Sequence, residues 1–275
     1  HSFLQQMRFG GFRPVVFLQH GLHVAILFGL ALLAAIALWR SLRRRVWVAA
    51  VVWLAATLVL CKSVGALVLT LAALPFALAP RALPRRAFML SVASVVLFYP
   101  MLRGVDLIPT RQIETWAASI SAARAQSIGF RFDNEDILLA RANERPLLGW
   151  GGWGRSRVYD PDTGADISTT DGRWIIVAGS YGWVGYLAEF GLLLWPVVAG
   201  ARMGVVGGAL ALLLCVNLLY LLPTPVLSPL TWMLAGALTG HVAVSARRAA
   251  KPKGRAAVHV TSQRRPNSRS EASPP

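Results

Sequence analysis

The polar middle of the chain, residues 130–191, reads FRFDNEDILLARANERPLLGWGGWGRSRVYDPDTGADISTTDGRWIIVAGSYGWVGYLAEFG. It overlaps a polar interval, Arg103 to Arg173, which carries nine arginines and 10 of the chain's 12 acidic residues. The chain as a whole is 55% hydrophobic, and long apolar runs flank the interval on both sides. The interval is therefore either a soluble lid between membrane spans or the place where the chemistry occurs.

The flanking apolar runs are long enough to cross a membrane. Mean hydropathy is +0.53, and a helix of about 17 residues or more spans a hydrocarbon core of about 30 Å. The sequence predicts an all-α protein: a polytopic transmembrane helix bundle of about seven spans with a large helical periplasmic loop. The expected spans are about Leu22–Trp39, Val46–Cys61, Val64–Leu78, Ala87–Leu102, Trp174–Ala199, Val205–Leu222 and Pro229–Val244.

These spans divide the chain into five regions. Residues 1–20 form an outer loop, residues 21–102 form four transmembrane helices, and residues 103–173 form the large periplasmic loop with short helices. Three more transmembrane helices follow over residues 174–246. Residues 247–275 are rich in Lys, Arg, Ser and Pro, and are expected to form a disordered basic cytoplasmic tail.

The net charge of +16 would also suit a protein that binds nucleic acid. Most of the excess positive charge, however, lies in short segments beside apolar runs and in the tail, as the positive-inside rule describes. The links that contain Arg40–Arg45 and Arg81–Arg86 therefore face the cytoplasm, with the tail against anionic membrane lipids. The interval Arg103–Arg173 then faces outward. This predicts a multi-pass protein of a bacterial inner membrane, with no nucleic acid partner.

Two stretches inside the polar interval predict helices. Thr110–Ala125 places apolar side chains on one helical face. Asn134–Asn143 follows Asp133, which is suited to be its N-cap, and Pro146 ends it.

The arginines of this interval are the most informative feature for function. A guanidinium group can bind two phosphate oxygens at once and stays charged. Tryptophan rings can stack on sugars. Together they are typical of a site for a saccharide linked to a lipid pyrophosphate. The alternative is that the arginines pair with the loop acids in an ordinary ion-paired lid. The residues concerned are Arg131, Arg141, Arg145, Arg155, Arg157 and Arg173, with Trp150, Trp153 and Trp174.

Two motifs carry a family resemblance. Arg131 is followed by a short helix and then by Pro146–Gly151 (PLLGWG). Further on, Asp171-Gly172 is followed by nine residues, Gly182, two residues and Gly185. Both patterns are similar to those of the O-antigen ligase/polymerase family. These integral membrane glycosyltransferases transfer glycans from undecaprenyl-pyrophosphate carriers.

Two adjacent positions depart from the family pattern. The ligases of the family carry a histidine where this chain has Asp171, and a polar residue where it has Gly172. A carboxylate can act as a general base toward a sugar hydroxyl, but it cannot donate a proton as imidazolium does. The departure favours a polymerase, or a branch that makes exopolysaccharide, over a ligase.

The resemblance implies catalytic roles for Asp171 and Arg131. Asp171 would take the proton of the acceptor hydroxyl, and it is equally suited to be the N-cap of the fifth span. Arg131 would neutralise the leaving pyrophosphate. His20 is a further candidate acid or base, or a structural residue at the mouth of a span. The expected substrate-binding residues are Arg13, Arg8, Arg145, Arg155, Arg157, Arg173, Trp150, Trp153, Trp174, Gly182 and Gly185.

The expected activity is that of an inverting, metal-independent glycosyltransferase with no cofactor, in exopolysaccharide or O-antigen biosynthesis. The donor would be a polyprenyl-pyrophosphate-linked glycan, and the acceptor a hydroxyl of a glycan, lipid or protein. Two alternatives stay open: a transporter or flippase for the lipid-linked saccharide, and a non-catalytic membrane subunit. Transporters usually place ionisable residues at mid-membrane depth, where this chain has mainly Glu189. Because the chain begins with His1 inside a polar stretch, we expect it to be the C-terminal part of a longer protein.

Overall fold

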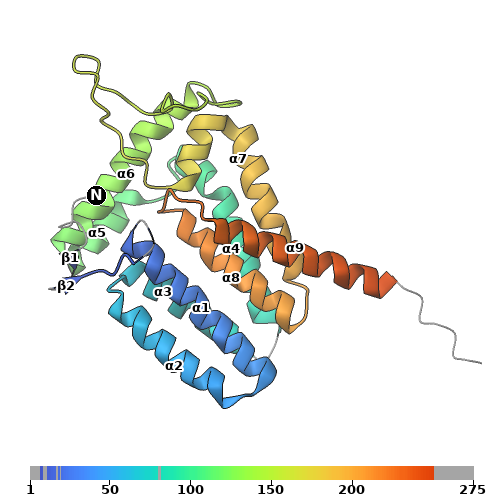
Figure 1. Ribbon diagram of the computed structural model, residues 1–275. Coiled ribbons are helices and arrows are strands. Elements are labelled where there is room, and N and C mark those ends of the chain that lie inside the picture. Colours follow the sequence, from blue (N-terminus) through green and yellow to red (C-terminus); the bar gives the residue numbers. More distant parts are fainter. Residues whose placement is uncertain (1–6, 9–10, 17, 19, 80–81, 251–275) are drawn as a thin grey trace, which may run out of the picture.

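The structure is a computed structural model that describes residues 7–8, 11–16, 18, 20–79 and 82–250 (Figure 1). The prediction of an all-α protein is confirmed, because helices make up 74% of the structure. The strands found in the described part are β1 (Met7–Arg8) and β2 (Gly11–Phe12), a short antiparallel ladder. The helices are α1 (Gly21–Leu42), α2 (Arg45–Leu60), α3 (Val64–Leu78), α4 (Ala82–Gly104), α5 (Thr110–Ile120), α6 (Ala122–Asn143), α7 (Arg173–Gly200), α8 (Val205–Leu221) and α9 (Pro229–Ala250).

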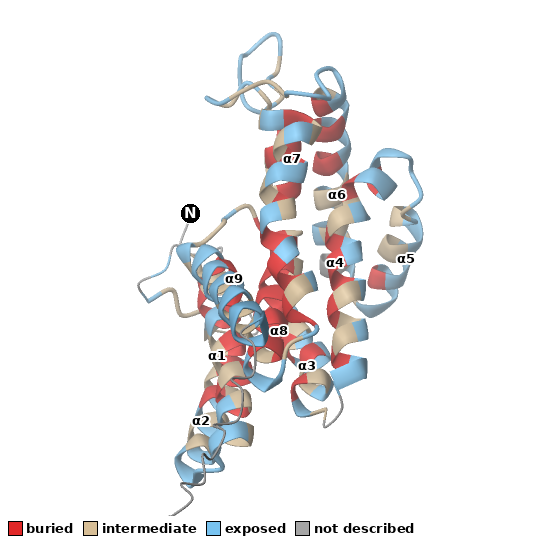
Figure 2. Ribbon diagram, turned by 90° about the vertical axis from the view of Figure 1, so that its right-hand side faces the viewer, coloured by how far each residue is buried: buried red, intermediate tan, exposed pale blue. Residues whose placement is uncertain are grey.

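Helix α8 lies at the centre of the bundle. It contacts α1, α3, α4, α7 and α9, and most of its residues are buried (Figure 2). Its sequence explains this position, because it is apolar on every side and the small residues Gly207, Gly208 and Ala211 let neighbouring groups approach closely. The pair α5 and α6 lies outside this core, with α6 against α7.

In the part of the chain that the structure describes, three helices are long and apolar enough to cross a membrane by length and composition: α1, α4 and α7. Helices α2, α3 and α8 are also apolar but shorter, at 10–17 residues. Large apolar side chains remain exposed on several of these helices, among them Trp53, Leu60, Leu71 and Trp195. An apolar exterior of this kind is what a lipid environment would cover. Association with a membrane is therefore supported at the level of individual helices.

The predicted helix bounds in the flanking regions agree with the structure at most ends, although α4 begins at Ala82 rather than at the predicted Ala87. Helix α3 has the predicted bounds, and α7 differs from its prediction by one residue at each end. Helix α9 is longer than predicted, because it continues to Ala250 through residues assigned to the tail. The rest of the predicted tail, residues 251–275, lies outside the described residues, as do residues 1–6, 9, 10, 17 and 19 of the predicted outer loop 1–20.

The predicted helices of the polar interval need correction. Helix α5 ends at Ile120, Ser121 is extended (φ −167°, ψ 129°), and α6 then runs unbroken to Asn143. Asp133 therefore lies inside α6, so the prediction that it is an N-cap was wrong. Helix α5 packs against α6, and Gly129 leaves room for Glu114, whose carboxyl carbon is 3.6 Å from the Cβ position. This tertiary contact favours helix across a stretch with no clear periodicity of its own.

Candidate functional site

Arg131 and Asp171, the two residues that the motifs of the resemblance single out, lie close together in the structure. The Nε atom of Arg131 lies 3.5 Å from Oδ2 of Asp171, and the two side chains are 37% and 30% exposed. A terminal nitrogen of Arg131 also lies 3.5 Å from the carbonyl oxygen of Pro223, in the link between α8 and α9. The pair is long and partly exposed, so it is weak and can open toward another ligand.

The partnership of Asp171 decides one of the open alternatives. The N-cap of α7 is Gly172, and no side chain caps that helix. Of the two alternatives left open for Asp171, the N-cap of the fifth span is therefore excluded, because its carboxylate faces Arg131 on α6 instead. The role of Asp171 as a base stays a prediction.

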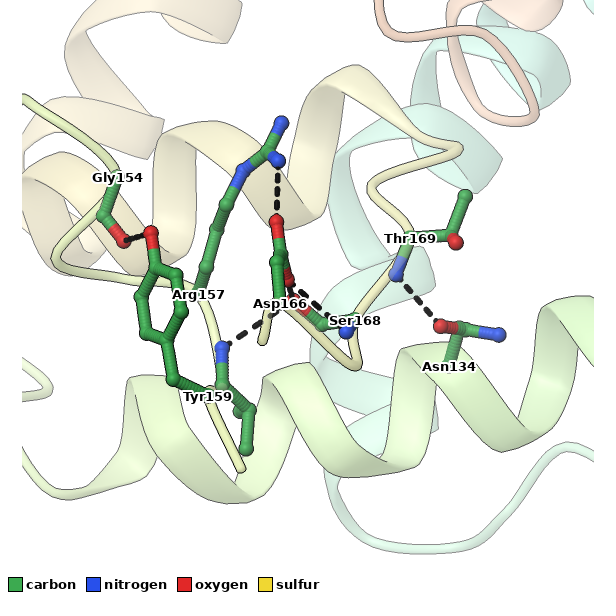
Figure 3. A network of polar contacts seen from close by, with 8 residues as sticks. Asn134, Gly154, Arg157, Tyr159, Asp166, Ser168 and Thr169 are labelled. Carbon is green, nitrogen blue, oxygen red and sulfur yellow. Dashed lines mark hydrogen bonds and ion pairs between the residues drawn. The ribbon is translucent and has the colours of Figure 1, made fainter. Parts of the chain in front are cut away.

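A hydrogen bond beside this pair holds the two segments together (Figure 3). The amide N–H of Thr169 donates to Oδ1 of Asn134 at 2.6 Å. Asn134 is itself fixed, because its Nδ2 donates to the carbonyl oxygen of Phe130 at 2.7 Å. Asn134 lies about one helical turn after Arg131, and Thr169 lies two residues before Asp171. Asn134 is therefore a positioning residue for the Arg131–Asp171 pair.

Replacing Asn134 with alanine is expected to release Thr169 and to loosen the Arg131–Asp171 pair. Asn134 is buried, and loss of a buried hydrogen-bonding group costs about 1–3 kcal/mol of unfolding free energy. Hydrogen exchange at the Thr169 amide should rise in Asn134→Ala. Asn143→Ala, an exposed change at the end of the same helix, is the matched control. Unchanged protection at Thr169 would contradict the assignment.

The segment before Thr169 folds on itself. Arg157 pairs with Asp166, and Asp166 also accepts hydrogen bonds from the N–H and hydroxyl of Ser168 at 3.0 and 2.9 Å (Figure 3). Partial burial alone would raise the pKa of Asp166, but the hydrogen bonds from Arg157 and Ser168 hold that pKa below its ordinary value. For Arg157, this geometry favours the alternative of an ion-paired lid over substrate binding.

The outer loop approaches the same region. Arg13 donates from Nε to the carbonyl oxygen of Lys62 at 3.2 Å and packs against Gly21, where a Cβ would lie 2.7 Å from that of Arg13. His20 is the N-cap of α1, and its Nδ1 accepts from the N–H of Leu22 at 3.1 Å. This favours the structural alternative for His20. Arg8 lies in β1, but the position of its side chain is outside the described residues.

Tyr220 connects this region to a pocket. Both Arg13 and Arg131 lie close enough to act electrostatically on the buried side chain of Tyr220. Tyr220 also lines a pocket of about 480 Å³ between α1, α8 and the segment 226–231. The pocket is mostly apolar, with His23 and Asn217 among its few polar residues. A partly exposed arginine–carboxylate pair therefore lies near a largely apolar pocket at one end of the bundle.

The two glycine motifs bind each other through their backbones. Gly182 breaks α7, with φ 64° and ψ −166°, which frees carbonyl and amide groups on either side of the break. Trp183 donates to Pro146 at 2.7 Å and Val184 donates to Leu147 at 3.2 Å. The structure thus gives Gly182 a role in docking the PLLGWG loop, and its substrate contact stays a prediction.

The other side of the break completes the docking. The N–H groups of Trp150 and Gly151 donate to the carbonyls of Gly179 and Ser180, both at 2.8 Å. Gly149 has φ +68°, and a Cβ there would lie 2.5 Å from the Ser180 carbonyl carbon. Only glycine permits this backbone approach. Gly185 is also tightly packed, because a Cβ there would lie 2.2 Å from the Cβ of Tyr181.

The three tryptophans proposed for sugar stacking differ in exposure. Trp153 is 98% exposed, whereas Trp174 is fully buried beside Tyr99. Trp174 has no free face for a sugar, so its predicted stacking role needs correction. The ring of Trp150 lies under two guanidinium groups, with Arg141 at 3.4 Å and Arg145 at 4.2 Å from its centroid. Such cation–π contacts fix both arginines beside the docked loop.

The last two predicted arginines have partners within the chain. Arg173 forms a two-point ion pair with Glu189, at 2.7 and 2.6 Å. Nε of Arg155 donates to the carbonyl oxygen of Gly152 at 3.1 Å. Because two nitrogens of the Arg173 guanidinium bind Glu189, few of its donors remain for a phosphate. The same ion pair neutralises Glu189, the carboxylate that a transporter would use.

Sequence reasoning missed a buried ion cluster at the end of α4. Arg103 is 2% exposed and lies 3.4 Å from Glu135 and 2.5 Å from Asp136, both on α6. Tyr99 donates to Glu135 at 3.0 Å. The sequence signal for this cluster was weak. It consisted of an arginine at the end of an apolar run, and the acidic partners Glu135 and Asp136 lie far from that arginine in the sequence. The cluster joins the membrane bundle to the helix that carries Arg131.

Glu135 gives this cluster a dependence on pH. Burial raises the pKa of Glu135 above its ordinary value of 4.5, against the opposing effects of Tyr99 and Arg103. Because the folded protein then holds this proton at pH values where the unfolded chain has lost it, stability falls as pH rises from 4.5 through the raised pKa. We expect Glu135→Gln to remove this part of the pH slope in thermal unfolding. An unchanged pH slope in Glu135→Gln would contradict this assignment. Glu144→Gln, which replaces an exposed glutamate, is the control.

Comparison with known proteins identifies no family and no related structure for this chain. No protein-family model, curated protein or solved structure matches this chain. Among the described residues, no three His, Cys, Asp or Glu side chains are grouped as metal ligands. What can be said of function therefore rests on the site geometry and on the sequence motifs.

Proposed function

We propose that this chain is part of a membrane glycosyltransferase that takes its glycan from a polyprenyl-pyrophosphate carrier, as the resemblance to the O-antigen ligase/polymerase family implies. The observation that carries the proposal is the partly exposed Arg131–Asp171 pair near a largely apolar pocket. A substrate with an anionic pyrophosphate between a sugar and a long apolar chain requires this combination of charge and apolar surface.

In the proposed reaction, Asp171 takes the proton of the acceptor hydroxyl, whose oxygen attacks the anomeric carbon. The bond from that carbon to the pyrophosphate oxygen breaks, and Arg131, aided by Arg13, stabilises the charge that develops there. An inverting displacement places the attacking and leaving oxygens on opposite sides of the carbon. The contact between Arg131 and Asp171 must therefore open when substrate binds, which their 3.5 Å separation and partial exposure allow.

The proposed arrangement in the membrane uses helices α1–α4 and α7–α9 as seven spans. The segment between α4 and α7 then faces the periplasm, and the arginine-rich turns face the cytoplasm. In this arrangement the Arg131–Asp171 pair lies at the outer membrane surface, where an undecaprenyl carrier presents its glycan.

The test is product analysis on the purified full-length protein supplied with a lipid-linked oligosaccharide. A ladder of longer lipid-linked chains without added acceptor is the expected result and would identify a polymerase. Transfer only after a lipid or protein acceptor is added would identify a ligase. Arg131→Ala and Asp171→Asn should each lower the product by about 100-fold or more, because each removes a group needed in the transition state.

Arg111→Ala is the control for the loss of an exposed arginine in the same segment. Normal product from both Arg131→Ala and Asp171→Asn, in folded protein, would overturn the catalytic proposal. That result would favour a non-catalytic membrane subunit.

A further inference from the structure

A second pair of arginines lies where the end of α1 meets the start of α4, and Figure 1 shows the end of α1 at the opposite end of the bundle from α6. Arg40 is in the last turn of α1 and Arg85 is in the first turn of α4. Both line a small cavity of about 20 Å³, together with Ala77 and Val205. Two positive groups therefore converge from helices that are far apart in sequence.

The surroundings hold these two guanidinium groups in place but give them no counter-charge. Arg85 is only 8% exposed, and its Nε has no hydrogen-bond partner. Gly208 on α8 makes room for it, because a Cβ there would lie 2.6 Å from Cζ of Arg85. Arg40 donates to the carbonyl oxygens of Ala77 and, at 3.0 Å, of Ala79.

No carboxylate side chain of the neighbouring helices can neutralise the pair. The first acidic residue of the chain is Asp106, and residues 190–270 contain no Asp or Glu. Helices α1–α4, α8 and α9 are therefore free of acidic residues. A buried charge without a partner is strongly unfavourable. The negative charge is expected to come from a bound group.

The rim of the cavity indicates what kind of group this is. The N-terminus of α8 lies at the cavity, which Val205 lines. Its N-cap is Gly204, which has no side chain to cap the first amide groups of the helix. These amide groups therefore favour an anion. Nearby on α4 and α8, Leu83, Val205 and Val206 are 73%, 54% and 56% exposed. A space of about 20 Å³ admits one water-sized group. A single anionic oxygen can enter while the rest of the ligand stays at the mouth.

We propose that Arg40 and Arg85 form a binding site for a phosphate group, and that the exposed apolar rim favours the phosphodiester of an anionic phospholipid. Arginine suits this role because its fork binds phosphate oxygens at two points. The site is separate from the Arg131–Asp171 pair and does not depend on the proposed function.

The test measures retained lipid on the purified full chain by native mass spectrometry. The protein is equilibrated with phosphatidylglycerol, with phosphatidylcholine, or with inorganic phosphate alone. We expect phosphatidylglycerol to be retained, and Arg85→Gln and Arg40→Gln each to lower that retention by about ten-fold, the effect of one charge-assisted hydrogen bond. Arg44→Gln, which removes an exposed arginine at the same end, should leave retention nearly unchanged.

The remaining outcomes separate the sources of the phosphate. If inorganic phosphate raises the thermal unfolding midpoint of the wild type but not of Arg85→Gln, and no lipid is retained, the site binds free phosphate rather than lipid. Equal retention in wild type, Arg85→Gln and Arg40→Gln would overturn the site. If Arg85→Gln does not fold, Arg40→Gln decides, because it leaves the buried guanidinium of Arg85 in place.

Discussion

Replacing Arg103 with methionine is expected to lower the free energy of unfolding by about 3–5 kcal/mol, the cost of removing one partner of a buried ion pair. Glu135 is the main reason, because its side chain is only 11% exposed. Asp106 and Asp136 are 93% and 58% exposed and can turn to solvent. The variant leaves one buried carboxylate beside Tyr99 without its cation. Thermal unfolding of the full chain in detergent measures the effect.

Two further variants make this prediction specific. Arg111→Met removes an exposed arginine from the neighbouring segment and should change stability little. The double variant Arg103→Met/Glu135→Gln should recover part of the loss, because glutamine can still accept the hydrogen bond from Tyr99. A double variant no more stable than the single one would show that Arg103 acts by packing rather than by charge.

Replacing Gly182 with alanine is expected to undock the PLLGWG loop from α7. The conformation of Gly182, with φ 64° and ψ −166°, lies in a region that is essentially restricted to glycine and costs about 1–3 kcal/mol for other residues. A Cβ would also lie 2.3 Å from the carbonyl oxygen of Leu147 and 2.6 Å from the Leu148 nitrogen. These atoms belong to the backbone and cannot move aside cheaply. Hydrogen exchange at the Trp183 and Val184 amides should rise.

Gly191 supplies the matched control for this change. It lies in the same helix, has no positive φ and has open space at its Cβ position, so Gly191→Ala should be neutral or slightly stabilising. If Gly182→Ala kept the wild-type unfolding midpoint and amide protection, the docking would not depend on the break in α7.

The sequence predicted the apolar helices well because their ends are set locally. The run Val64–Leu78 lies between a lysine–serine turn and a proline–arginine link, and α3 has those bounds. The two motifs of the resemblance singled out Arg131 and Asp171, and the side chains of these residues lie 3.5 Å apart. In both cases the signal was in neighbouring residues or in a fixed spacing.

The features that were missed depend on contacts between distant segments. Ser121 ends α5 although nothing nearby marks a break, and Asp133 lies inside α6 because that helix packs against α5 and α7. Trp174 was predicted to stack on a sugar, but the fold buries it beside Tyr99. The spacing motif singled out Gly182, but it did not predict that α7 breaks there. Its importance comes from the loop that binds there.

The docked loop and the Asn134 hydrogen bond also define a separable unit. Gly151 is held by the Ser180 carbonyl, and Thr169 is held by Asn134. Between these two anchors, the segment forms most of its polar contacts with itself, including those of Arg157 with Asp166. Residues near its tip, around Gly164, where a Cβ would meet no atom within 4 Å, can therefore accept an inserted epitope or fluorophore. Such an insertion would report from which side of a membrane the segment is reached, without displacing Arg131 or Asp171.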